Sequence, residues 1–74
     1  MVRINWEQYK EYKRHSHKED NFEILLDFLK SFYNMTNPYD VYDSLAADDL
    51  GQMMLGKRDI TDAEDMENYL FRVK

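Results

Sequence analysis

Residues 22–33 carry apolar side chains around most of a helix, and this segment constrains the fold more than any other. Its apolar residues recur at spacings of three and four, the period of an α-helix, and others widen this stripe to a second side. A narrow polar edge consists of Glu23, Asp27, Lys30 and Asn34. Because a helix of this kind is usually contacted from two sides, we expect it at the centre of the core.

Capping residues predict a helix on either side of this central segment. Asn5 can cap a helix over about residues 6–15, which a polar connection separates from the central helix. After the central helix, Pro38 suits the first turn of a helix, and the residue before a proline disfavours helical backbone. Asn37 is therefore the expected cap of a third helix that ends near residue 47.

The last third of the chain has weaker signals. Residues 48–56 fit either a short separate helix or an extension of the third, with Gly56 as its C-terminal stop. Thr61 and Glu64, three residues apart, predict a capping box at the start of a last helix. We therefore predict an all-α fold, a small bundle of four to five short helices in a single domain over residues 1–74.

A minor alternative is an α+β fold with a short pair of strands from the two termini. Val2, Ile4 and Trp6 alternate with polar residues, as in a strand, and could pair with residues 69–73. An alternation this short is weak evidence for a strand, so the helical bundle is preferred.

The composition predicts a folded but small domain. Apolar residues make up 43% of the 74-residue chain, which is too many for a chain that stays disordered. A domain of this size buries only about 60% of its unfolded surface, and such domains often gain stability by packing against a second copy or another protein. A homodimer is therefore one expectation.

Cysteine is absent, which excludes disulfides, thiolate metal sites and a catalytic thiol. The first ten residues carry charges where a signal peptide has an apolar run, and the apolar stretches of the whole chain are short. These features predict a soluble, cytoplasmic protein without a membrane span.

Acidic residues concentrate in the C-terminal half. Residues 40–67 contain nine acids and two bases, Lys57 and Arg58, for a net charge of −7, whereas residues 1–20 have a net charge of +1. Because carboxylates repel phosphates, direct nucleic-acid binding by this half is not expected. Its field would instead steer it towards basic surfaces.

Neither a metal site nor a catalytic site is expected. His15 and His17 stand two residues apart, whereas helical metal sites need spacings of three or four, and the C-terminal acids do not match the spacing of a calcium loop. No nucleophile motif or glycine-rich phosphate loop is present, and a chain of this length has little wall for a cleft. We therefore expect no cofactor and no enzyme activity.

Some apolar side chains have no clear place in the predicted core. Met53 and Met54 fit core positions at one end of the bundle, which is the favoured interpretation, but residues 53–55 cannot all face inward on one helix. The alternative is an adaptable binding patch. Tyr39 and Phe71 lie outside the apolar stripes and near acids, as contact anchors often do.

The charge pattern and these side chains predict a small acidic protein–protein interaction module that docks on a basic surface of a larger protein. A regulator or inhibitor of the type encoded by phages and mobile elements would have this composition. The expected partner-binding residues are Tyr39, Asp40, Tyr42, Asp43, Asp48, Asp49, Met53, Met54, Asp62, Asp65 and Phe71.

Three alternatives stay open. The first is a nucleic-acid mimic that blocks a DNA-binding protein, although Lys57 and Arg58 interrupt the acidic run. The others are a self-associating structural domain and a weak nucleic-acid binder that uses the N-terminal helix, whose bases are diluted by Glu7 and Glu11.

Overall fold

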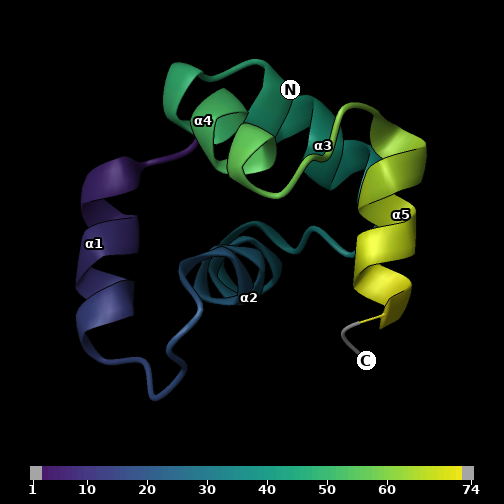
Figure 1. Ribbon diagram of the computed structural model, residues 1–74. Helices are drawn as coiled ribbons and strands as arrows, with labels where there is room; N and C mark the ends of the chain where they lie inside the picture. The colour runs from purple at the N-terminus through teal and green to yellow at the C-terminus, as the bar shows by residue number, and fades with distance from the viewer. Residues whose placement is uncertain (1–2, 73–74) are drawn as a thin grey trace.

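The computed structural model describes residues 3–72, and this part of the chain is folded into helices without a β-strand. The helices are α1 (Trp6–Arg14), α2 (Asn21–Tyr33), α3 (Pro38–Ala46), α4 (Asp49–Lys57) and α5 (Ala63–Arg72). The predicted all-α bundle is confirmed. Figure 1 shows α2 end-on, with α1 on one side, α5 on the other, and α3 and α4 above.

The minor α+β alternative is wrong. Trp6 is the first residue of α1 and Tyr69 lies in α5, so their backbone groups are used within helices and cannot pair as strands. Val2 and Val73, the other ends of the proposed pair, lie outside the described residues.

The first four helices each begin after an Asn or Asp. The side chain of that residue accepts a hydrogen bond from a backbone N–H of the first turn, which otherwise has no partner within the helix. The predicted caps at Asn5 and Asn37 are confirmed, with distances of 3.1 Å to the Gln8 nitrogen and 2.8 Å to the Tyr39 nitrogen.

The start of α5 differs from the prediction by one residue. The cap is Asp62, whose Oδ1 accepts a hydrogen bond from the Asp65 N–H at 2.8 Å. The Asp65 carboxylate in turn accepts from the backbone N–H and the hydroxyl of Thr61, at 3.0 and 2.7 Å. The predicted box of Thr61 and Glu64 is therefore wrong, because Asp is a stronger cap than Thr and an aspartate stands three residues after it.

Residues 49–57 form the separate helix α4, not an extension of α3. Its predicted stop at Gly56 is wrong, since α4 continues to Lys57 and the chain turns at Asp59, which has a φ of 57°. Gly51 has another role. A Cβ at this position would lie 2.2 Å from the carbonyl oxygen of Leu45, so only glycine lets α4 pack this closely on α3.

The predicted central position of the second helix is confirmed. Most of the fully buried large side chains belong to α2, namely Phe22, Leu25, Phe28 and Leu29. The other helices add residues to the same core, chiefly Leu45, Leu55 and Met66. The Phe28 ring alone lies within 5.7 Å of the rings of four neighbours, which are Tyr9, Tyr12, Phe32 and Tyr33.

Candidate interaction surface

Three of the predicted contact acids are used inside the chain. Asp48 caps α4 and also accepts a hydrogen bond from the indole nitrogen of Trp6 at 2.9 Å, which ties α1 to the α3–α4 junction. Asp62 and Asp65 form the cap of α5. Hydrogen bonds from Thr61 hold the pKa of Asp65 below its ordinary value. These carboxylates are thus engaged in local structure.

Two of the predicted contact side chains, Tyr42 and Met54, also make contacts within the chain. The Tyr42 hydroxyl donates a hydrogen bond to the carbonyl oxygen of Thr61 at 2.8 Å, which fastens the α4–α5 connection to α3. Met54 is half-buried and packs against the core. The core interpretation therefore holds for Met54 but not for Met53, whose side chain is 58% exposed.

Three other predicted acids, Asp40, Asp43 and Asp49, are exposed. Within residues 3–72 none of them makes a side-chain hydrogen bond or an ion pair. Asp40 and Asp43 line one shallow hollow and Asp49 lines a second, and both hollows include Ser44 and Ala47 of the α3–α4 junction. We call Asp40, Asp43 and Asp49 the acidic edge.

Exposed apolar side chains lie at both ends of the acidic edge. Tyr39, which directly precedes Asp40, is 51% exposed, and Leu50, which follows Asp49, is 47% exposed. Phe71 is the most exposed at 76% but belongs to α5, where it lines a different hollow with Asp65. Leu50 thus lines one hollow of the acidic edge, Tyr39 is the chain neighbour of Asp40, and Phe71 lies away from both hollows.

Leu50 is not among the predicted contact residues. It stands three and four residues before Met53 and Met54, a spacing that favours a core position for it as well. The buried positions of α4 are instead Gly51 and Leu55, four residues apart. A glycine within a helix can mark a point of close packing. With Gly51 on the inner face of α4, its neighbour Leu50 lies on the exposed side.

The two bases that interrupt the acidic run lie elsewhere. The Arg58 guanidinium makes a short ion pair with Asp20 at the start of α2 and stands 5.8 Å above the centre of the Phe22 ring. Lys57 and Arg58 line one hollow together with Glu19 and Asp20. Neither base lines the hollows of the acidic edge, where Arg3 is the base among the described residues.

No family model, no curated protein and no solved structure matches this chain. Among residues 3–72, no three His, Asp or Glu side chains lie close enough together to hold a metal ion. None of the helices in this range has the length and apolar character that a membrane crossing requires. The function is therefore inferred from the surface of the molecule.

Replacing Asp48 by alanine is expected to lower the free energy of unfolding by about 1–2 kcal/mol, the usual effect of losing a helix cap. The hydrogen bond from Trp6, and then those from the backbone N–H groups of Gly51 and Leu50, hold the pKa of Asp48 below its ordinary value of 3.8. Urea titrations followed by the fluorescence of Trp6 measure the loss. Asp49→Ala, at the next position, removes no hydrogen bond and serves as the control.

The pH dependence of Asp48 has a defined sign. Because the folded-state pKa is lowered, the carboxylate stabilises the fold above the unfolded-state pKa, and this contribution disappears as pH falls through the folded-state pKa. Asp48→Asn retains a capping oxygen without the charge. The stability difference between wild type and Asp48→Asn should therefore be present at pH 6 and vanish in acid. A difference that grows in acid would contradict this assignment.

Proposed function

We propose that the protein is a small interaction module that docks its acidic edge on a basic surface of a larger protein and thereby regulates or inhibits it. The observation that carries this proposal is that Asp40, Asp43 and Asp49 have no side-chain partner within residues 3–72, whereas neighbouring acids are used as caps. A carboxylate with no internal bond to break can pair with an arginine or lysine of another protein at low cost.

The surroundings of the acidic edge support docking. Ser44 and Ala47 are small, so the hollows on either side leave room for the side chains of a partner. Tyr39 and Leu50 add exposed apolar area beside the charges, and interfaces commonly combine such anchors with a polar rim. The net charge of −5 would speed the encounter with a basic partner at low ionic strength.

Nucleic-acid mimicry is the second candidate, and the position of two bases favours it. Lys57 and Arg58 interrupt the acidic run in the sequence, but in space they lie beside Glu19 and Asp20. Arg3 lines one hollow of the acidic edge, so the structure places one base there in place of the two in the acidic run. A mimic would bind the nucleic-acid groove of its partner, so added DNA should compete with it, whereas docking elsewhere on a basic surface is insensitive to DNA.

Affinity capture with the tagged protein, from a lysate of the cells in which it occurs, tests the proposal. We expect a specific partner that is lost in high-salt washes, because exposed ion pairs are screened by salt. The combined Asp40→Asn, Asp43→Asn and Asp49→Asn variant should bind this partner at least tenfold more weakly, through the loss of three charge contacts.

The matched control neutralises three exposed acids outside the acidic edge, in the variant Glu19→Gln, Glu64→Gln and Glu67→Gln. It changes the net charge by the same amount and should retain at least half of the affinity. Equal losses in both variants would mean that net charge alone drives binding. Recovery of only the protein itself would contradict the proposed function.

A further inference from the structure

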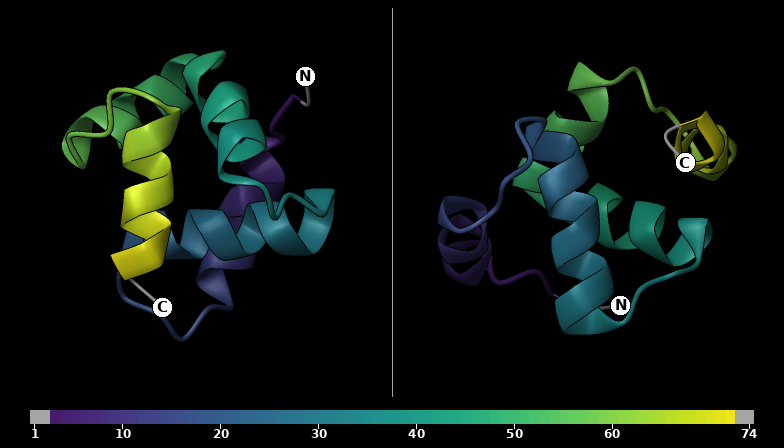
Figure 2. Two further views of the ribbon diagram at one scale, coloured as in Figure 1. Left: turned by 90° about the vertical axis from the view of Figure 1, so that its right-hand side faces the viewer. Right: turned by 90° about the horizontal axis from the view of Figure 1, so that it is seen from below.

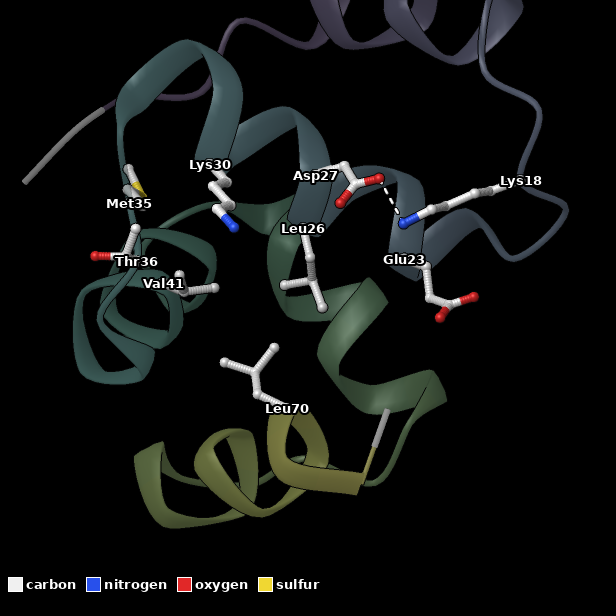
Figure 3. A pocket seen from close by; sticks show the side chains of 9 residues that line it. All are labelled: Lys18, Glu23, Leu26, Asp27, Lys30, Met35, Thr36, Val41 and Leu70. Carbon is white, nitrogen blue, oxygen red and sulfur yellow. Dashed lines mark ion pairs between the residues drawn. The ribbon is translucent and has the colours of Figure 1, made fainter. Parts of the chain in front are cut away.

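An open groove lies between α2, α3 and α5. Its lining includes none of the residues of the acidic edge. Its volume is about 400 Å³, and Leu26, Val41 and Leu70 form its apolar floor. Figure 3 shows Leu26 of α2 and Leu70 of α5 facing each other across this gap. Both leucines are only half-buried, so each keeps apolar surface that a further molecule could cover.

The charges on the lip of the groove come largely from α2. Glu23, Leu26, Asp27 and Lys30 follow one another at helical spacings and so share a face of α2. In Figure 1 no helix of the described chain lies below α2, and the view from below in Figure 2 shows α2 uncovered on that side. All four residues also line the open groove. We call these four residues the α2 stripe.

The α2 stripe has its two unpaired charges at opposite ends. Glu23 and Lys30 are seven residues apart, about 10 Å along the helix axis, and neither forms an ion pair within residues 3–72. Asp27, between them, is already neutralised by Lys18 of the α1–α2 connection, with 2.6 Å between nitrogen and oxygen. The order along the stripe is therefore negative, apolar, neutralised, positive.

The charges of the α2 stripe are complementary to those of a second α2 stripe that runs in the opposite direction. If a second copy lays its α2 antiparallel on the first, Glu23 of each copy meets Lys30 of the other, and the two-fold axis passes close to Leu26 and Asp27. The Leu26 side chain of each copy then lies near the axis at the edge of its own groove, since an isologous interface brings equivalent residues together. Asp27 meets its own copy without repulsion because Lys18 already balances its charge.

We propose that the α2 stripe and the groove beside it form the interface of a two-fold symmetric homodimer. A second copy is the occupant because a single surface supplies both halves of the charge pattern and both apolar contacts. Small domains commonly gain stability in this way. The interface uses none of the acidic edge, so each copy in the dimer keeps its own edge free, and the two proposals can fail independently.

Charge reversal tests the interface by sedimentation equilibrium, which separates the 9.1 kDa monomer from the dimer. Glu23→Lys places two lysines opposite each other at both ends, and Lys30→Glu places two glutamates there. Each variant should dimerise about tenfold more weakly than wild type. The double variant restores opposite charges and should dimerise like wild type.

Mixing the two single variants gives the sharpest result. One copy then carries lysine at both positions and the other glutamate at both, so the mixture should form a heterodimer although each component alone is mainly monomeric. Lys13→Glu and Glu64→Lys change the net charge equally, at exposed positions outside the groove, and should dimerise like wild type. Circular dichroism spectra of all the variants serve as the control for folding.

Any of three results would overturn the proposal. A wild-type chain that stays monomeric at millimolar concentration would leave the groove to a different occupant. Opposite effects of Glu23→Lys and Lys30→Glu would show that association follows net charge and not the antiparallel pairing. A double variant that fails to recover would show that these two residues do not face each other across the interface.

Discussion

Replacing Phe28 by alanine is expected to lower the free energy of unfolding by about 3–5 kcal/mol, the usual range for removing a buried phenylalanine. Its side chain is fully buried, and its ring contacts those of Tyr9 and Tyr12 on α1 as well as two aromatic rings of α2. A chain of 74 residues typically has a total stability of about 4–11 kcal/mol. The variant should therefore be close to unfolding in water.

Phe32→Ala is the matched control for this prediction. Phe32 lies one turn later on α2 and is nearly half exposed, with ring contacts to Tyr12 and Phe28. Its loss should lower the stability by only about 1 kcal/mol. Urea denaturation of both variants, followed by far-UV circular dichroism, gives the two values. A loss below 1 kcal/mol for Phe28→Ala would mean that this ring is not central to the core.

The two glycines of α4 are expected to respond to alanine with opposite signs. Gly51→Ala places a methyl group against the backbone of Leu45, at 2.2 Å from its oxygen, and backbone cannot rotate away as a side chain can. We expect a loss of about 3 kcal/mol as α3 and α4 are forced apart. Gly56→Ala meets no atom within 4 Å and should stabilise the protein by about 0.5–1 kcal/mol.

Thermal unfolding of the two variants, measured side by side, checks this prediction. The substitution is chemically the same and both positions lie in the same helix without a positive φ, so any difference comes from their surroundings. Stabilisation by Gly51→Ala would show that α3 and α4 do not pack as closely as described. A loss at Gly56 would show that this residue is needed to end the helix.

The features predicted correctly from the sequence depend on near neighbours. The caps at Asn5 and Asn37 are hydrogen bonds to residues two or three positions later, so the identity of a few adjacent residues decides them. The burial of α2 follows from the number of its apolar side chains, which leaves few ways to orient it. The exposure of Tyr39 and Phe71 follows from the same periodicity.

The errors have two physical origins. At the start of α5, Thr61 and Asp62 are both acceptable caps. A cap at Thr61 would pair with Glu64, whereas the cap at Asp62 accepts a hydrogen bond from the Asp65 N–H. At α4, Gly56 resembles a helix stop, but the end of the helix is set by the turn at Asp59. In both cases a neighbouring residue sets the boundary: the stronger cap Asp62 starts α5, and the turn at Asp59 follows the end of α4.

The candidate surface was predicted only in part, because a list of acids does not show which of them are already used. Asp48 is a predicted contact acid, but its carboxylate accepts a hydrogen bond from the indole N–H of Trp6, 42 positions earlier. Similarly, Arg58 interrupts the acidic run in the sequence, but in the structure it pairs with Asp20, 38 positions away. Such pairs join segments whose approach depends on the whole fold.

The all-α class, the central place of α2 and most helix starts follow from the sequence, because the helical period and capping hydrogen bonds act over at most four residues. The packing of the helices decides which carboxylates stay free, that Gly51 brings α4 against α3, and that an open groove lies beside α2. These properties arise where helices distant in the chain meet, since the packing of a whole core sets those distances.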